Sequence, residues 1–369
     1  MVTKQQKIIH LIAAARPNFM KIAPLYHALV KEEWAEPIIV HSGQHYDLNM
    51  SDVFFRDLQL PDPPIHLGVG SGSHAEQTGK VMIAYEKILQ GRRPDLVVVV
   101  GDVNSTMAAT LAAVKMGIKV AHLEAGLRSF DRTMPEEINR IVTDSLADYL
   151  WTPSPDGDEN LKREGVAAEK IVRVGNIMID SLEMMRPGIE AEVYFKKLNL
   201  AEKKYALVTL HRPGNVDSRV SLALIVQTLL DISKDIPVVF PLHPRTRNRL
   251  EQFGLLAAVQ AAEGLTLLEP LSYIQFMSLV FSTRLVITDS GGVQEETTYL
   301  GIPCLTLRPN TERPITVQVG TNTMCKPEEL AGHVGQILTG SGNKKNIPEF
   351  WDGHTAARVV TAIKSHLAV

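Results

Sequence analysis

The chain has 369 residues, and at a typical domain size of about 150 residues this length predicts two domains or three and excludes one small domain. Its 38 Lys and Arg residues nearly balance its 41 Asp and Glu residues, giving a formal net charge of −3, and 45% of its residues are apolar. Without a long basic block, this ordinary globular composition argues against nucleic acid or an anionic membrane as the main partner. Two cysteines in so long a chain favour a reducing compartment over a disulfide framework.

The N-terminus combines Lys4 and Lys7 with an apolar run, which resembles a short secretory signal. However, His10 interrupts the run, and Arg16-Pro17 follows where a cleavage region would need small residues. An opening β-strand explains the segment better. Since no apolar stretch reaches the roughly 18 residues of a membrane span, we expect a cytoplasmic protein that is not embedded in a membrane.

In chain order, continuous apolar runs bounded by Gly, Pro or Asp alternate with segments of helical periodicity. The predicted strands are Lys7–Ala15, Pro37–His41, Leu96–Gly101, Lys119–Leu123, Tyr205–Leu210, Pro237–Leu242, Leu285–Thr288 and Pro303–Leu307. The predicted helices are Met20–Lys31, Ser73–Leu89, Ser105–Met116, Pro135–Leu150, Ser221–Ser233, Gln294–Leu300 and roughly Gly353–Leu367. This alternation indicates an α/β fold with parallel sheets whose strands are buried on both faces.

The strand–helix series occurs twice, so we expect two Rossmann-like domains that face a cleft. We place the N-terminal domain at residues 1–174 and the C-terminal domain at residues 175–354. The last helix, residues 355–369, has no following strand and could pack on either domain.

The carboxyl ends of the strands are where such sheets bind ligands. After the first strand, Arg16 and Lys21 occur in place of a G-x-G-x-x-G loop, which argues against a nicotinamide enzyme and would suit a phosphate, although a solvated first turn explains them equally well. In the second half, Ser290-Gly291-Gly292 opens a helix, with Glu296 one turn on and Arg313 after the next strand. These residues fit a phosphate loop with a ribose-binding carboxylate, and they also fit an ordinary strand-to-helix turn.

The first half supplies carboxylates instead. Asp102 and Glu124 each follow a buried strand, and Glu136 begins a helix. Each alone has a structural explanation, but three acids at one sheet edge favour proton transfer. His211 ends another strand and could assist a departing phosphate. His41 and His45 lie on a loop and the cysteines have no metal-binding spacing, so we predict no metal site.

Together these residues resemble the non-hydrolysing UDP-N-acetylglucosamine 2-epimerase family from about Lys7 to the C-terminal helix. The motifs that carry the resemblance are Arg16-Pro-x-x-x-Lys21-x-x-Pro24-Leu25, Gly101-Asp102, His122-Leu-Glu124-Ala-Gly-Leu-Arg128, Pro135-Glu136-Glu137-x-Asn139-Arg140, His211-Arg212, Asp289-Ser-Gly-Gly-x-Gln-Glu-Glu296 and Thr311-Glu-Arg313-Pro314. Each motif is modest alone, but seven in one order make a specific pattern.

The resemblance implies a glycosyltransferase-B-like fold whose last helix packs on the N-terminal domain, and a homodimer that needs no cofactor. It implies inversion at C2 of UDP-N-acetylglucosamine to give UDP-N-acetylmannosamine for polysaccharide biosynthesis, by elimination of UDP to a 2-acetamidoglucal and re-addition. The implied acid/base set is Asp102, Glu124 and Glu136, with His211 assisting UDP. The implied contacts to the UDP-sugar are Arg16, Lys21, Phe276, Ser290, Gly291, Gly292, Glu296 and Arg313.

The segment Gln44-His45-Tyr46-Asp47 departs from the pattern of many bacterial members near an activating second substrate molecule, which puts such activation in doubt. This segment and Leu242-His243-Pro-Arg-Thr-Arg247 also resemble relatives that act on UDP-2,3-diacetamido-2,3-dideoxy-glucuronate. Gln44 and His243 are therefore expected as sugar or regulatory contacts. Alternative functions are a hydrolysing epimerase, a glycosyltransferase of the same fold and a non-catalytic sensor of UDP-sugars.

Overall fold

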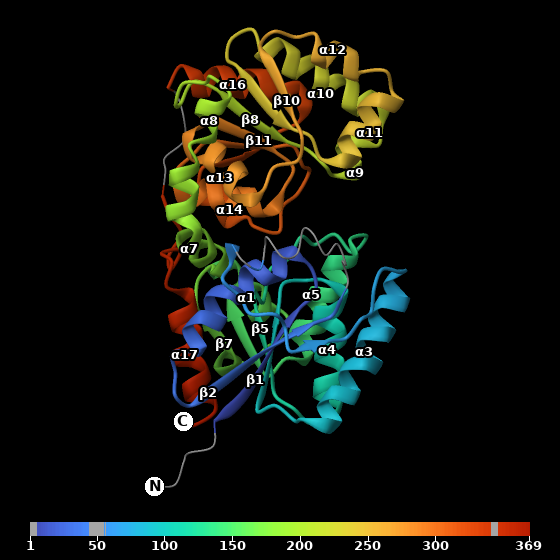
Figure 1. Cartoon of the computed structure of the whole chain (residues 1–369), viewed down its shortest axis with the longest axis vertical. Helices are drawn as coiled ribbons and strands as arrows, with labels where there is room; N and C mark the ends of the chain where they lie inside the picture. The colour runs from blue at the N-terminus through green and yellow to red at the C-terminus, as the bar shows by residue number, and fades with distance from the viewer. Residues whose placement is uncertain (1–5, 44–54, 56, 341–345) are drawn as a thin grey trace. The chain divides into compact units, whose positions relative to one another are not determined.

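The computed structural model describes residues 6–43, 55, 57–340 and 346–369, and of Arg16 it describes the backbone only. Contacts between residues divide the chain into two compact units, one formed by Met1–Met184 and Glu349–Val369 and the other by Met185–Pro348 (Figure 1). The first division falls inside α7 (Ile177–Glu192), whereas we expected a boundary at residue 174, just before this helix.

Within its described residues, the first unit contains a seven-stranded parallel sheet in the order β3-β2-β1-β4-β5-β6-β7. Its strands are β1 (Lys7–Ala13), β2 (Ala35–His41), β3 (Ile65–His66), β4 (Leu96–Val100), β5 (Val120–Leu123), β6 (Tyr149–Thr152) and β7 (Ile171–Arg173). Its helices are α1 (Arg16–Leu29), α3 (His74–Gly91), α4 (Asn104–Lys115), α5 (Pro135–Leu146), α6 (Pro155–Arg163), the short η1 (Ala168–Lys170), the start of α7 and α17 (Thr355–His366). In Figure 1, α3 and α4 cover one face of the sheet while α1 and α17 cover the other.

The second unit has a six-stranded parallel sheet in the order β10-β9-β8-β11-β12-β13. Its strands are β8 (Ala206–Thr209), β9 (Val238–Pro241), β10 (Leu265–Leu268), β11 (Leu285–Thr288), β12 (Cys304–Thr306) and β13 (Asn322–Met324). Its helices are α8 (Tyr194–Lys197), α9 (Pro213–Val216), α10 (Arg219–Ile232), α11 (Pro244–Gln252), α12 (Leu256–Gln260), α13 (Tyr273–Ser282), α14 (Gly291–Leu300), α15 (Ile315–Gln318), η2 (Pro327–Glu329) and α16 (Leu330–Leu338). The two sheets confirm the predicted α/β class with two Rossmann-like units.

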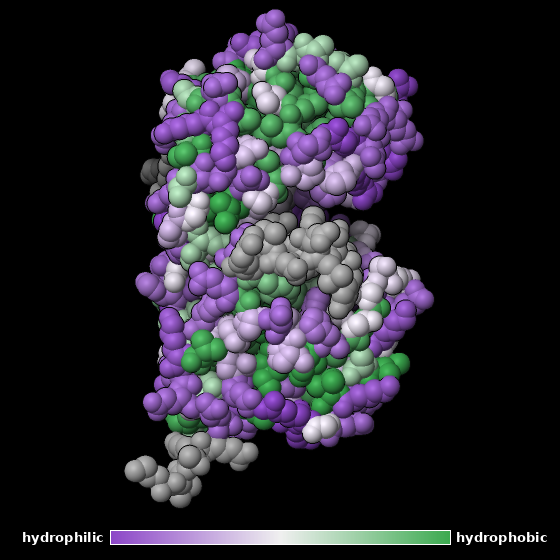
Figure 2. Space-filling view, viewed as in Figure 1, coloured by the Kyte–Doolittle hydropathy of each residue, from purple (hydrophilic) through white to green (hydrophobic). Residues whose placement is uncertain are grey.

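The central strands explain why this sequence forms parallel sheets. All five residues of β4 are buried, and four of them are valine. β-Branched side chains suit a pleated surface, and helices on both faces remove it from water. Helices and loops carry the polar residues, and in the view of Figure 2 hydrophilic side chains cover much of each unit, with apolar ones between them.

The eight strands expected from apolar runs are all present, with ends shifted by a few residues. The helix predicted at Pro135–Leu150 is too long, because α5 ends at Leu146 and Tyr149–Thr152 forms β6. No Gly or Pro marks this change; instead the Asp148 carboxylate accepts a hydrogen bond from the Val120 amide at 3.0 Å and turns the chain into the sheet. The short strands β3, β6, β7, β10 and β13 were not predicted.

The C-terminal segment returns to the first unit, where α17 packs against α1. Asp180 accepts hydrogen bonds from the Thr355 and Ala356 amides at 3.1 and 2.8 Å, which caps the start of α17. Near its end, Lys364 Nζ lies 2.7 Å from Glu32 Oε2. None of the described helices is long and apolar enough to cross a membrane.

Candidate active site

In each sheet some of the candidate residues follow the two neighbouring strands between which the strand order reverses. In the first unit these strands are β1 and β4, followed by the start of α1 and by Asp102. In the second unit they are β8 and β11, followed by His211 and Ser290. Such reversal points are where open parallel sheets leave room for a ligand.

Glu124 follows β5, next to β4, and is buried with 4% of its surface exposed. Its carboxylate pairs with the ammonium of Lys21 on α1, which is also buried. Its backbone has a φ of +72°, a conformation that strains a residue with a side chain and that is typical of functional sites. The other carboxylate oxygen, Oε1, is buried and has no hydrogen-bond partner among the described residues.

Gly101 lets this pair form. Its φ is +65°, and a Cβ atom at this position would lie 2.9 Å from Lys21 Nζ and 3.4 Å from Glu124 Oε2. Glycine is therefore needed both for the turn after β4 and for the close approach of Lys21.

Asp102 is held by the helix that carries Glu136. Arg140 donates to Asp102 Oδ2 from Nη2 at 2.7 Å and from Nε at 3.1 Å, and Asn139 Nδ2 donates to the Asp102 carbonyl at 2.9 Å. Glu136 lies half-buried in the first turn of this helix, α5. The sequence motif contains Asn139 and Arg140, but we assigned them no function from the sequence. Their spacing of three and four residues from Glu136 places all three side chains on one face of a helix and could have indicated a shared site.

In the second unit, Asp289 orients His211. Asp289 Oδ1 lies 3.0 Å from His211 Nδ1, and the carboxylate also accepts hydrogen bonds from the His211 and Arg212 amides and from Asn215 Nδ2. Burial raises the pKa of Asp289, but His211 and these hydrogen bonds outweigh it and keep the pKa below its usual value. An ionised Asp289 holds a proton on Nδ1 and leaves Nε2 of His211 for a ligand.

Ser290 and Gly291 form the start of α14, whose first amides have no partner within the helix. A Cβ atom on Gly291 would lie 2.8 Å from both Arg313 Nη1 and Glu312 Oε1, so glycine lets these groups approach the helix start. Arg313 is itself fixed by Glu295 at 2.8 Å and Glu312 at 2.6 Å. A helix N-terminus beside an oriented guanidinium is a suitable site for a phosphate.

Glu296, one turn further along α14, is buried and accepts a hydrogen bond from Tyr273 Oη at 2.7 Å. Burial, and to a lesser extent Glu295, raises the pKa of Glu296 to about 7, against the lowering effect of the Tyr273 hydrogen bond. Tyr273 and the half-buried Phe276 both lie on α13. Glu296 is therefore a buried carboxyl group whose surroundings favour its protonated form.

The family model described as UDP-N-acetylglucosamine 2-epimerase matches residues 27–364 of this chain. The chain belongs to the UDP-N-acetylglucosamine 2-epimerase family. This confirms the resemblance inferred from the motifs.

Individual relatives agree with this assignment. The UDP-N-acetylglucosamine 2-epimerase of Methanocaldococcus jannaschii is 42% identical over 362 residues, which cover 95% of this chain and 97% of the relative. Its crystal structure in complex with UDP-GlcNAc and UDP matches with a TM-score of 0.86 over 97% of this chain and 99% of that one.

Two further matches concern substrate and fold. A UDP-2,3-diacetamido-2,3-dideoxy-D-glucuronate 2-epimerase of Pseudomonas aeruginosa is also 42% identical, over 322 residues that cover 86% of this chain and 88% of the relative. A glycosyltransferase structure from Rickettsia africae, 13% identical with a TM-score of 0.59 over 98% of this chain and 99% of that one, shares the fold alone. The glycosyltransferase-B-like fold expected for the family is thus confirmed.

Two of the residues carried over from the epimerase family are not described in full. Gln44 lies outside the described residues, and Arg16 is described only as the first backbone position of α1. His243 is exposed at the start of α11, where its Nδ1 accepts a hydrogen bond from the Arg245 amide at 3.2 Å, and its ring lies 5.5 Å from that of His211. Among the described residues, no group of three or more His, Cys, Asp or Glu could hold a metal ion.

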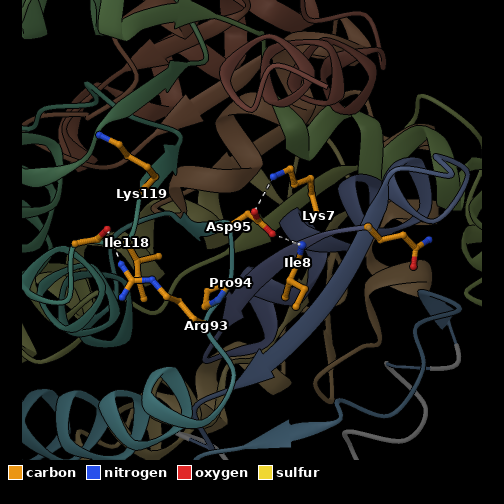
Figure 3. A pocket seen from close by; sticks show the side chains of 9 residues that line it. Lys7, Ile8, Arg93, Pro94, Asp95, Ile118 and Lys119 are labelled. Carbon is orange, nitrogen blue, oxygen red and sulfur yellow. Dashed lines mark hydrogen bonds and ion pairs between the residues drawn. The ribbon is translucent and has the colours of Figure 1, made fainter. Parts of the chain in front are cut away.

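A pocket of about 410 Å³ lies at the other end of the first sheet, among residues at the start of β1 and just before β4 and β5 (Figure 3). Its charged side chains already have partners: Lys7 pairs with Asp95 at 3.0 Å and Lys119 with Asp148 at 2.6 Å. No residue that the epimerase family implies lies there. The pocket is therefore separate from the candidate active site.

Proposed function

We propose that this protein interconverts UDP-N-acetylglucosamine and UDP-N-acetylmannosamine by inversion at C2. The proposal rests chiefly on Asp102, Glu124 and Glu136 at the carboxyl edge of one sheet, in a chain of the epimerase family. The named activity of the Methanocaldococcus relative supports the same substrate.

In the proposed reaction, a carboxylate removes the C2 proton while the bond between C1 and the UDP oxygen breaks, leaving a double bond between C1 and C2. UDP then adds back to C1 while an acid delivers a proton to the other face of C2. The sequence of elimination and addition involves no net oxidation, so it requires no redox cofactor. The three acids and the Lys21–Glu124 pair supply groups that can take and return these protons.

The second unit supplies the groups for UDP. Arg313 and the start of α14 suit the diphosphate, Glu296 suits the ribose, and His211, oriented by Asp289, assists departure and return of UDP. We further propose that the enzyme is a cytoplasmic homodimer that serves polysaccharide biosynthesis.

The identity with the Pseudomonas relative makes UDP-2,3-diacetamido-2,3-dideoxy-glucuronate the second candidate substrate. Both sugars should be given to the purified protein and followed by proton and phosphorus NMR. The proposal predicts conversion of UDP-N-acetylglucosamine to its C2 epimer with no accumulation of free UDP. Turnover of the uronate alone would transfer the same chemistry to the second substrate, and stoichiometric release of UDP with free sugar would instead indicate a hydrolysing enzyme.

A further inference from the structure

His122 is a buried histidine, paired with Asp144, that has no role in the proposed reaction. It lies on β5, two residues before Glu124, and none of its surface is exposed. Its Nδ1 is 2.6 Å from Asp144 Oδ1 on α5, and its Nε2 is 2.8 Å from the carbonyl oxygen of Gly101. Both ring nitrogens therefore face oxygen atoms.

These contacts define the protonation state of His122. A carbonyl oxygen and an ionised carboxylate can only accept hydrogen bonds, whereas a neutral imidazole donates from one nitrogen only. Both contacts can thus be hydrogen bonds only if both ring nitrogens carry protons. Asp144 Oδ2 also accepts hydrogen bonds from the Arg128 guanidinium at 2.7 Å and from the Gly126 amide at 3.0 Å, and these two donors favour the ionised carboxylate.

The charge balance of the surrounding cluster agrees with a charged His122. Arg128 donates to Asp144 Oδ2 at 2.7 Å and forms two hydrogen bonds with Glu164, at 2.8 and 2.7 Å. With a protonated imidazole the cluster has two cations and two carboxylates and is neutral overall. Within this cluster His122, Arg128 and Asp144 are buried, whereas Glu164 is exposed to solvent.

The cluster is hydrogen-bonded to the backbone just before Asp102 and shortly after Glu124. The Gly101 carbonyl that His122 holds belongs to the peptide unit that leads into Asp102. Asp144 Oδ2 accepts a hydrogen bond from the Gly126 amide at 3.0 Å, two residues after the strained Glu124. Asp144 lies on α5, the helix whose first turn contains Glu136. The His122–Asp144 pair is therefore hydrogen-bonded to the loop that carries Asp102 and to the loop that follows Glu124. One of its members, Asp144, lies on the same helix as Glu136.

We infer that His122, as an imidazolium paired with Asp144, is a positioning residue that fixes the spacing of the three acids. It does not touch the substrate in this role; its ring holds the Gly101 carbonyl before Asp102, and its partner Asp144 holds the Gly126 amide two residues after Glu124. The kinetic part of this inference rests on the proposed epimerase function, whereas the protonation state does not.

The protonation state can be measured by nitrogen NMR of the full chain labelled with ¹⁵N-histidine. His122 should show protons on both ring nitrogens at pH 7.5, and the signals should disappear in His122→Gln. His10 is the internal control, because it is equally buried on β1 with Tyr85 as its partner, and burial, with a smaller effect of Arg92, lowers its pKa to about 4. A His122 ring with one unprotonated nitrogen would overturn the inference whether or not the protein is an epimerase.

The positioning role can be measured by steady-state kinetics of His122→Gln and Asp144→Asn. We expect kcat to fall about tenfold to a hundredfold per folded molecule, since small displacements of reacting groups cost this much, while KM and UDP affinity stay unchanged. His10→Gln, which changes a histidine of equal burial outside the cluster, should keep its kcat. Unchanged kcat per folded molecule in both cluster variants would overturn the positioning role, whereas a wild-type protein without epimerase activity would contradict the proposed function instead.

Discussion

At the scale of single residues, the carboxylate of Asp289 has the most clearly defined effect on a candidate catalytic group. It fixes the ring of His211 at Nδ1 and accepts hydrogen bonds from the amides of His211 and Arg212. Asp289→Asn removes the charge that favours the Nδ1 proton. We predict a fall in kcat of about tenfold to a hundredfold with folding retained, measured by steady-state kinetics and circular dichroism.

Asp217→Asn is the matched control for this prediction. Asp217 belongs to the same unit, but its carboxylate pairs with Arg245 and Arg249 rather than with His211. It should keep the wild-type kcat. Equal losses in the two variants would show that Asp289 acts through general stability rather than through His211.

Glu296 gives a second prediction at this scale, which concerns pH. Its pKa of about 7 in the folded protein lies above the ordinary 4.5, so folding favours the protonated form. This contribution to stability is fully present below pH 4.5 and is lost as the pH rises through 7, with a total of up to about 3 kcal/mol. Denaturant unfolding without ligand at pH 5 and pH 8 should show a smaller decrease in stability for Glu296→Gln than for the wild type; equal decreases would contradict the shifted pKa.

Sequence patterns identified the acids and glycines of the site but not the side chains that orient them. Asp102, Glu124 and His211 each directly or almost directly follow an apolar run, so the end of a strand predicted their place. Asp144, Arg140 and Asp289 act through contacts across tens of residues in the chain, such as the 78 residues between His211 and Asp289. No local period or composition encodes these contacts, and the fold has to form before they become visible.

At the scale of secondary-structure elements, the turn after β4 is specified by glycine. Gly101→Ala would strain a backbone with a φ of +65° and push a Cβ atom against Lys21 Nζ. We predict a loss of about 1 kcal/mol in the free energy of unfolding together with a clear loss of kcat, because the Lys21–Glu124 pair has to move. Chemical denaturation and kinetics measure the two effects.

Gly117→Ala distinguishes the effect of backbone strain from the effect of displacing the Lys21–Glu124 pair. Gly117 has nearly the same φ, +66°, but among the described residues a Cβ atom there would meet only Arg93 Nη2, at an ordinary 3.7 Å. This variant should lose similar stability and keep its kcat. If both variants lost kcat equally, the crowding of Lys21 would not explain the need for Gly101.

Strands that form a long apolar run bounded by Gly, Pro or Asp were predicted well, whereas short strands were not predicted. β4 is a run of buried residues closed by glycine, whereas β3 has two residues and β13 has three. A strand of two or three residues is too short to show an apolar pattern that distinguishes it from a loop. Its pairing with a neighbouring strand determines that it forms. The end of α5 shows the same limit, because the side chain of Asp148 turns the chain there without Gly or Pro.

At the scale of the whole molecule, the two sheets carry different groups. The candidate acids belong to the first unit, and the proposed diphosphate and ribose groups at α14 belong to the second. Asp102→Asn and Glu136→Gln should therefore lower kcat at least about a hundredfold while the Kd for UDP, measured by calorimetry, stays unchanged. Loss of UDP affinity in either variant would contradict this division of tasks.

The most direct test of the proposed reaction follows the hydrogen at C2. Wild-type protein is incubated with UDP-N-acetylglucosamine in deuterated water, and both epimers are examined by NMR and mass spectrometry. Proton removal and return by the acids of the first unit predict one deuterium at C2 of the UDP-N-acetylmannosamine formed, and in time at C2 of the remaining substrate. Epimer formed with its original hydrogen at C2, or no epimer at all, would contradict the mechanism.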